Sequence, residues 1–496
     1  MGKSLTWKPL QAPLIKAETQ MNADKGTRMN ADKAKRMKLL PLVFALVLAG
    51  CASVPAIDAS RLPAAPAQFK EGDGRWTVAK PAEAQARGEW WKAFADPVLD
   101  DLVARADRSN ASIQVAAARL AQARAIARIT DADRMPQLGV DAGVSRLGGI
   151  VNGTGGPARS FGSAGANLSY ELDLFGKLAR ASDAARLDAR SRDGLLQSTR
   201  LLVQAEVAQT YLALRALDEE RAMVRGTVTA YRGTLELTQR RFRAGDVAEL
   251  DVSRAQTEVA ATESEALALD RRRAELEHAL AVLVGEVSSS FELPVAEWKT
   301  ALPVIPAGVP GTVLTRRPDV SAAQDGMLAA QQRVGVAKAA WFPDVELTAT
   351  GGYASSELSD LFKWSARAWG VGALLSLPVL DGGRREAGVQ NASAQLDEAV
   401  ARYREQVLVA FRDVEDQLSS LRLLADQAEA QQRAVASATR TTSLSDTRYR
   451  NGFVSQLDLL DAQRSELRNR RQAVQVRSGQ YQATVGLVRA LGGDWN

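Results

Sequence analysis

An internal repeat with an offset of 207 residues constrains this chain more than any other feature. The stretch RFRAGDVAELDVSRAQ, Arg241 to Gln256, recurs as RYRNGFVSQLDLLDAQ, Arg448 to Gln463, with eight of sixteen residues identical. The same offset relates Pro136 to Pro343 and LSYELDLFGK at 168–177 to LSLPVLDGGR at 375–384. The sequence therefore predicts two tandem copies of one structural unit.

The N-terminal region indicates export. Basic residues precede the apolar run LLPLVFALVL at 39–48, which is too short to span a bilayer but suits a signal peptide. The run ends in LAGC, which resembles a bacterial lipobox in which Cys51 becomes the acylated first residue of the mature chain. Ala52 after it implies sorting to the outer membrane. A duplicated MNADK upstream favours translation from Met29 or Met37.

Each repeat contains two segments in which apolar and polar residues alternate. The apolar rows are Leu138, Val140, Ala142 and Val144; Ala164, Ala166, Leu168, Tyr170 and Leu172; Val345, Leu347 and Ala349; and Trp369, Val371, Ala373 and Leu375. Strands of about 10 residues with this pattern are typical of transmembrane barrels, although a half-buried soluble hairpin shows the same periodicity. We expect the stretches between the paired segments, GGIVNGTGGPARS at 148–160 and SSELSDLFKWSAR at 355–367, to form exposed loops on one side of the membrane. Because four strands cannot close a barrel, several chains must contribute.

Long helical segments connect these strands. We expect helices at 177–240 and 384–447 and shorter returning helices at 247–285 and 454–491. In the second long segment, apolar residues from Val407 to Ala428 step by three and four, the spacing of a coiled-coil seam. The repeated turn then lies at the far tip of each helical hairpin, where Gly245 and Gly452 permit the chain to reverse. Leu250 and Leu457 are expected to re-enter the seam.

Several motifs together resemble the TolC-like outer-membrane factors of tripartite efflux systems, in particular the NodT-type lipoproteins that serve pumps of the RND class. They are the lipobox at Cys51, WWKAFADPVLDDLV at 90–103, RRPDV at 316–320, GVAKAAWFPDVEL at 335–347, the paired tips and the terminal ALGGDW. The resemblance implies a mixed α and β membrane protein. It would form a homotrimer with a twelve-stranded β-barrel, four strands per chain, continued by an α-helical coiled-coil tunnel in the periplasm.

The same resemblance implies the function and the partners. The protein would be the outer-membrane channel of an efflux pump, passively conducting substrates that an inner-membrane transporter and a periplasmic adaptor deliver, and it would contact outer-membrane lipid. Five segments are expected: 1–50 signal peptide with an upstream extension; 51–109 lipidated arm and first short helix; 110–286 first efflux repeat; 287–316 Pro-rich connector; 317–496 second efflux repeat.

The residues that form the periplasmic aperture in the family can be matched to positions of this sequence one at a time. Tyr449, Asp458 and Asp461 match its aperture motif, and Asp251 matches an acid that tethers neighbouring hairpins. Two departures bear on that tether: Arg254 replaces a second acid, and Val454 stands in place of a tethering arginine. Arg241, Arg448 and Arg450 are the alternative cations.

Other function classes fit less well. His278, the only histidine, lies on a helix surface, and the sequence offers no convergent catalytic, metal or cofactor site. The net charge is +5, but the arginines alternate with acids along helical faces, which favours solvated helix faces over nucleic-acid binding. A structural or adhesive coiled-coil lipoprotein without transport is the alternative, but such a fibre has no use for four alternating strands. The sequence leaves the cargo open among drugs, metal ions, solvents and oligosaccharide signals.

Overall fold

The structure is a computed structural model of the full chain. It describes residues 54–58, 60, 62–64, 69–71, 88–151, 154–303 and 316–493, with side chains outside 147–159. All elements given below belong to one compact unit, Val54–Asn496. Among the helices of these residues, none is long and apolar enough to cross a membrane.

Four strands form one antiparallel sheet in the order β1-β2-β3-β4. They are β1 (Gln137–Val151), β2 (Thr154–Leu172), β3 (Asp344–Ser355) and β4 (Arg367–Ser376). The register places apolar residues opposite one another, because Leu138 pairs with Leu168 and Leu168 with Ala349. Ala349 pairs in turn with Val371. The four predicted apolar rows therefore share one face, and β1 and β4 are the two unpaired edges.

Most of the apolar face of the sheet is left exposed by the part of the chain that the structure describes. Val140 is 84% exposed, Val371 76% and Trp369 77%, values typical of polar surface residues rather than of a core. The opposite face carries small and polar residues, among them Asn167, Glu171 and Glu346. A sheet of this kind needs either lipid or another protein against its apolar face.

One expectation about the sheet is wrong. We expected GGIVNGTGGPARS to form an exposed loop, whereas β1 continues to Val151 and β2 begins at Thr154. The glycines of this stretch lower the strand propensity, but they do not prevent backbone pairing. Gly149 pairs with Gly156 and Ile150 with Gly155 beyond a register shift. The first hairpin is thus longer than the predicted strands.

Two 67-residue helices dominate the structure, α4 (Lys177–Arg243) and α8 (Arg384–Arg450). The helices α5 (Glu249–Leu283) and α9 (Gln456–Leu491) return along them, as expected. Each long helix starts at a glycine in the left-handed conformation, Gly176 or Gly383. A carboxylate before it caps the helix: Asp173 accepts hydrogen bonds from the N–H groups of Leu178 and Ala179, and Asp381 caps α8 in the same way.

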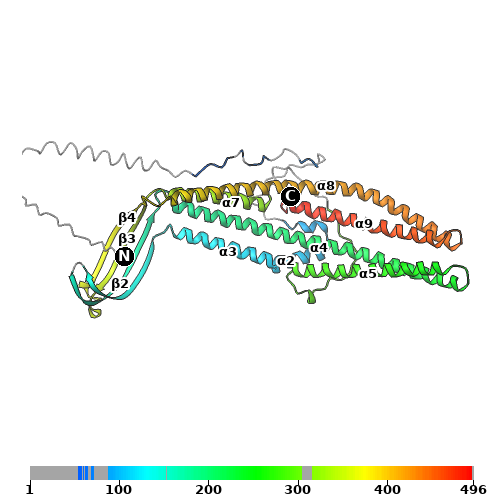
Figure 1. The fold of residues 1–496 in the computed structure, drawn as a ribbon, viewed down its shortest axis with the longest axis horizontal. Coiled ribbons are helices and arrows are strands. Elements are labelled where there is room, and N and C mark those ends of the chain that lie inside the picture. Colours follow the sequence, from blue (N-terminus) through cyan, green and yellow to red (C-terminus); the bar gives the residue numbers. More distant parts are fainter. Residues whose placement is uncertain are drawn as a thin grey trace, which may run out of the picture. The chain divides into compact units, whose positions relative to one another are not determined.

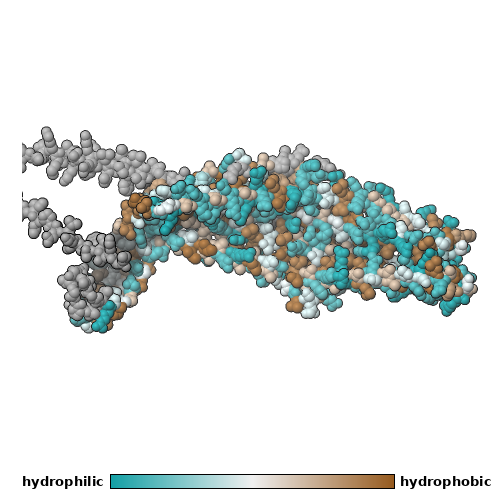
Figure 2. Space-filling model, viewed as in Figure 1, coloured by the Kyte–Doolittle hydropathy of each residue, from teal (hydrophilic) through white to brown (hydrophobic). Residues whose placement is uncertain are grey.

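Shorter helices complete the helical layer. They are α3 (Ala111–Ala132), which packs on α4, and α7 (Pro318–Ala339), which packs between α4 and α8. The sheet lies at one end of the long helices and the two hairpin tips lie at the other (Figure 1). Hydrophilic and hydrophobic residues mix over the helical surface in Figure 2. No single apolar band is visible on that face of the helices.

The largest core lies midway along the helices. There the 3-10 helix η2 (Trp90–Phe94) and α2 (Pro97–Ser109) pack against α4 and α9. The connector joins this core, because Trp298 packs against Tyr481 in a tilted arrangement with ring centroids 4.8 Å apart. The Tyr481 hydroxyl also donates a hydrogen bond of 2.5 Å to the Thr300 carbonyl. The described part of the connector is therefore packed, although its sequence is aperiodic.

Candidate functional site

The two hairpin tips have the same backbone geometry. Gly245 and Gly452 adopt φ values of +84° and +77°, which disfavour any residue with a side chain. At each tip the N–H of the residue after the glycine donates to a carbonyl five residues earlier, from Asp246 to Arg241 and from Phe453 to Arg448, both at 2.9 Å. These bonds close the C-terminus of each long helix. The repeated sequence therefore encodes one repeated turn.

The acids predicted for the aperture are exposed at the start of the returning helices. Asp458 forms a capping box with Ser455, whose hydroxyl donates to the carboxylate at 2.6 Å. This hydrogen bond and one from the Ser455 N–H hold the pKa of Asp458 below its ordinary value. Asp461 pairs with Arg464 at 3.2 Å. Asp458 thus has a structural role as a cap, but both carboxylates are exposed to water.

Tyr449 and Asp251 have different partners in the structure. The Tyr449 ring is buried and lies 5.0 Å beneath the guanidinium of Arg241, one of the three alternative cations. Asp251 instead pairs with Arg254 at 3.8 Å, the residue that departs from the family pattern. A cation–π contact between Arg241 and Tyr449 therefore joins the two tips.

The two hairpins are further joined by a ladder of ion pairs, defined here as Arg464 and Arg471 on α9 with their acidic partners. Arg464 reaches Glu258 on α5, with 2.9 Å between its Nε and a carboxylate oxygen. Arg471 binds Glu220 on α4 at 2.6 Å and also contacts Glu265 on α5. Glu220 and Glu258 are largely buried, at 10% and 15% side-chain exposure. The ladder was not predicted from the sequence.

Apolar contacts accompany the ladder. Tyr231, Val259 and Leu460 form a buried cluster between α4, α5 and α9. Burial raises the pKa of Tyr231 to about 12, so this ring stays neutral. The prediction that Leu250 and Leu457 enter the seam is wrong, since they are 57% and 43% exposed. In α9 the buried positions are instead Leu459 and Leu460, two and three residues further along the helix than Leu457.

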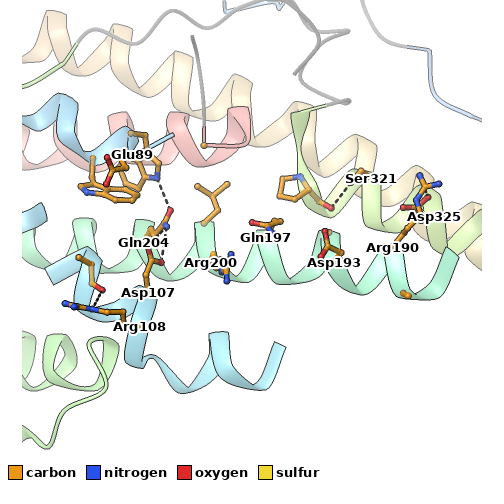
Figure 3. A pocket seen from close by; sticks show the side chains of 18 of the residues that line it. Glu89, Asp107, Arg108, Arg190, Asp193, Gln197, Arg200, Gln204, Ser321 and Asp325 are labelled. Atoms are coloured by element: carbon orange, nitrogen blue, oxygen red, sulfur yellow. Dashed lines mark hydrogen bonds and ion pairs between the residues drawn. The ribbon is translucent and has the colours of Figure 1, made fainter. Parts of the chain in front are cut away.

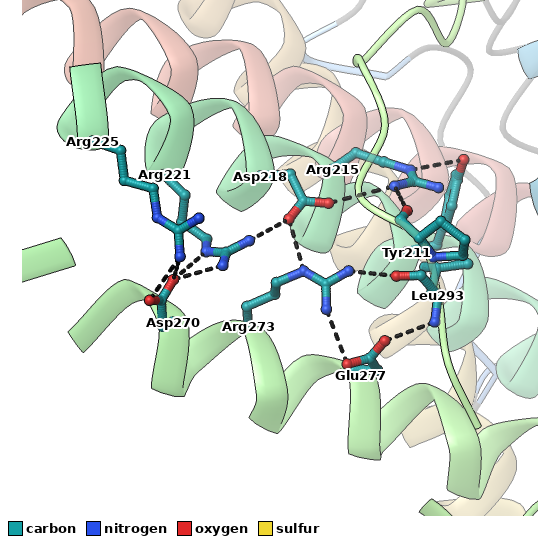
Figure 4. A network of polar contacts seen from close by, with 10 residues as sticks. Tyr211, Arg215, Asp218, Arg221, Arg225, Asp270, Arg273, Glu277 and Leu293 are labelled. Atoms are coloured by element: carbon teal, nitrogen blue, oxygen red, sulfur yellow. Dashed lines mark hydrogen bonds and ion pairs between the residues drawn. The ribbon is translucent and has the colours of Figure 1, made fainter. Parts of the chain in front are cut away.

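A buried network of charges lies between the tips and the central core (Figure 4). The Asp218 carboxylate, only 1% exposed, accepts from Arg273 at 2.9 Å, Arg221 at 3.1 Å and Arg215 at 3.4 Å. Arg215 also donates to the Pro294 carbonyl, and Glu277 accepts from the Leu293 N–H at 2.7 Å. The network therefore fastens the connector to α4 and α5.

A cavity of about 1280 Å³ opens between η2, α2, α4 and α7 (Figure 3). Its carboxylates are engaged: Asp193 pairs with Arg124 at 3.1 Å and Asp325 with Arg190 at 3.0 Å. Burial raises the pKa of Asp107, whose oxygens accept from the Gln204 amide at 3.0 Å. These paired charges offer a polar crevice between helices rather than a free nucleophile or base. Cys51, the predicted lipidation site, lies outside the described residues.

Comparison with known proteins places these features in a family. The family model described as "Outer membrane efflux protein" matches residues 102–286 and 309–493. The cation efflux system protein CusC of Escherichia coli is 31% identical over 462 residues, covering 92% of this chain and 99% of CusC. The pyoverdine export outer membrane protein OpmQ of Pseudomonas aeruginosa is 33% identical over 470 residues, covering 92% and 97%. The solved structure of the outer-membrane channel OprN superimposes with a TM-score of 0.82 at 29% identity, covering 90% of this chain and all of that one.

Proposed function

The chain belongs to the outer membrane efflux protein family, and from this premise we propose that three copies form one channel that conducts substrates from the periplasm across the outer membrane. One observation carries the proposal. A four-stranded sheet with an exposed apolar face and two unpaired edges runs directly into the longest helices of the chain. The barrel wall and the tunnel wall are thus parts of one continuous chain.

The trimer follows from the edges of the sheet. Unpaired N–H and C=O groups on β1 and β4 would be very unfavourable in lipid, where water cannot satisfy them. Pairing β1 of one chain with β4 of the next removes every edge, and three chains give twelve strands. Three copies of the α3, α4, α7 and α8 layer then continue the barrel as a helical tunnel, with the six hairpin tips at its far end.

The proposed partners are a periplasmic adaptor and an inner-membrane pump of the RND class. Relatives with similar identity to this chain are named for cargo as different as a cation and pyoverdine. Such variety supports a passive duct, in which the pump and the adaptor select the cargo. The paired charges around the cavity between α2 and α4 agree with this role, and we assign no catalytic step to the chain.

The proposed anchor is a lipid on Cys51. We expect the mature chain to begin at this residue with acyl chains attached, because the short apolar run and LAGC precede it. Mass spectrometry of the intact mature protein tests this directly. Cys51→Ser should leave the tunnel folded but weaken membrane attachment, since each buried CH₂ contributes about 0.8 kcal/mol. An unmodified Cys51, or a mature N-terminus upstream of it, would contradict the prediction.

The proposed aperture is a ring of six carboxylates, Asp458 and Asp461 from three chains. Both are exposed and three residues apart, so that they can face the same axis. Charges that converge on a narrow aqueous opening repel one another and attract cations. We therefore expect purified protein in planar bilayers to show discrete conductance steps that are cation-selective and blocked by multivalent cations added at the tip side.

Asp458→Ala/Asp461→Ala supplies the comparison for these recordings. The double variant should still give conductance steps, but lose most of the cation selectivity and the block. Because Asp458 also caps α9, Asp458→Asn/Asp461→Asn is the second variant, which removes charge while keeping a capping side chain. Equal selectivity and equal block in all three proteins would place the constriction elsewhere. Absence of any conductance step in the wild type would contradict the proposed channel.

A further inference from the structure

The connection between β3 and β4 folds onto the apolar face of the sheet. A Cβ atom placed on Gly162 would lie 3.1 Å from Leu358 Cδ2 and 3.8 Å from Leu361 Cδ2, so both leucines cover this glycine. Gly162 alternates along β2 with Ala164 and Ala166, and therefore belongs to the apolar row. The connection thus lies against the side of the sheet that the proposed barrel turns toward lipid.

Two aromatic rings of this connection are largely exposed on the surface of the chain. Phe362 and Trp364 are both 73% exposed, although Phe362 also packs edge-on against Tyr353 with ring centroids 5.8 Å apart. Tyr353 is the register partner of Ala164 and so lies on the same apolar face. Aromatic side chains at the end of an apolar band are typical of the boundary between hydrocarbon and headgroups.

Basic residues lie at the same end of the sheet. The Arg367 guanidinium stacks on Trp364, 3.7 Å from the ring centroid, and Arg367 is in the same row as Trp369 and Val371. Arg146 continues the row of Leu138 and Val144 on β1. Among the described residues neither arginine forms an ion pair with a carboxylate, whereas Lys363 pairs with Asp360 at 2.7 Å. Stacking also leaves the N–H edge of a guanidinium free to donate.

Closure of the barrel would place these two arginines on adjacent strands. Arg146 is on β1 and Arg367 is on β4, the two edges that pair between chains in the proposed trimer. Two guanidinium groups on adjacent strands repel each other at the rim of an apolar band. A phosphate between them would offset this repulsion and could accept bidentate hydrogen bonds from each.

We propose that Arg146 and Arg367 of neighbouring chains, with Trp364 and Phe362, bind the phosphorylated headgroup of an outer-leaflet glycolipid. The proposal rests on the proposed barrel. The aromatic rings would lie at the level of the sugar and the uppermost acyl carbons, while the guanidinium groups bind the phosphates. The occupant is a lipid rather than a soluble anion because the patch is continuous with the lipid-facing apolar rows.

Native mass spectrometry of delipidated trimers in detergent, titrated with bis-phosphorylated lipid A, tests the proposal. Wild-type trimers should bind up to three lipid A molecules, one for each pair of neighbouring chains. Arg146→Gln/Arg367→Gln should lower the affinity at least tenfold. Arg134→Gln, the same change three residues before the start of β1 and so beyond the opposite end of that strand, is the matched control and should bind like the wild type. Fully dephosphorylated lipid A should bind the wild type as weakly as phosphorylated lipid A binds the double variant.

Equal binding by wild type and double variant, or equal binding of the two lipids by the wild type, would overturn the lipid site. The same samples are recorded in planar bilayers to separate this failure from failure of the channel. Trimers that conduct but do not distinguish the lipids contradict the lipid site alone. A wild-type protein that is monomeric and does not conduct contradicts the channel, and the lipid site with it.

Discussion

Asp218→Ala is expected to lower the free energy of unfolding by about 3–5 kcal/mol, because it leaves three guanidinium groups around a buried site without their common carboxylate. Arg215, Arg221 and Arg273 are between 4% and 12% exposed and cannot all turn to water without unpacking α4 from α5. The connector should loosen as well, since Arg215 also holds the Pro294 carbonyl. Urea denaturation followed by tryptophan fluorescence measures the change, because Trp298 lies in the same connector.

Two further variants serve as comparisons for the loss of stability in Asp218→Ala. Asp218→Asn keeps the shape and one acceptor oxygen, so we expect a smaller loss than with alanine. Asp193→Asn removes an exposed partner of Arg124, with about half of each side chain open to water, and should change stability by at most about 1 kcal/mol. If Asp218→Ala proves no more damaging than Asp193→Asn, the network is not holding the connector.

The second large effect is expected at the tips. Arg464→Gln/Arg471→Gln removes the ladder that joins α9 to α4 and α5, and should shift the proposed channel toward its open state. We take each of the two arginines, with its acidic partners, to stabilise the closed state by about 1 kcal/mol. Loss of both then raises the ratio of open to closed channels roughly thirtyfold, since 1.4 kcal/mol corresponds to a factor of about ten. Single-channel recordings should show longer and more frequent openings than the wild type.

Arg271→Gln is the control for this variant. Arg271 pairs with Glu275 on its own helix, and both side chains are largely exposed, so its loss leaves the two hairpins joined. Identical open probabilities in the ladder variant and in this control would show that the two hairpins need not separate for the channel to open. Circular dichroism checks that the ladder variant is folded. Its spectrum should match that of the wild type.

Much of the fold was readable from the sequence because the signals are local. The long helix predicted at 177–240 is observed at Lys177–Arg243, and the four alternating rows form one sheet. Gly245 and Gly452 mark the tips because a backbone with positive φ favours glycine at those positions. The observed first hairpin is longer than the predicted strands, because glycines lower the local strand propensity and yet pair across this hairpin. The pair Asn152-Gly153 is itself a strong sequence signal for a tight hairpin connection.

The contacts between helices were not predicted, because they depend on how each helix rotates about its axis. Glu258 and Glu265 are seven residues apart, as are Arg464 and Arg471, which is the spacing of one helical face. This pattern was a usable signal for the ladder, but it does not say which two faces meet. The packing of Trp298 and Thr300 against Tyr481 has no periodicity at all, and only the folded chain reveals it.

The mass of the protein extracted from outer membranes in mild detergent tests the central claim most directly, namely that three chains build one channel. Four strands per chain leave two edges that only neighbouring chains can satisfy. Native mass spectrometry should therefore give a species of three times the mature chain mass, which persists when the detergent is exchanged. A species with the mass of one chain, folded and stable under the same conditions, would contradict the account.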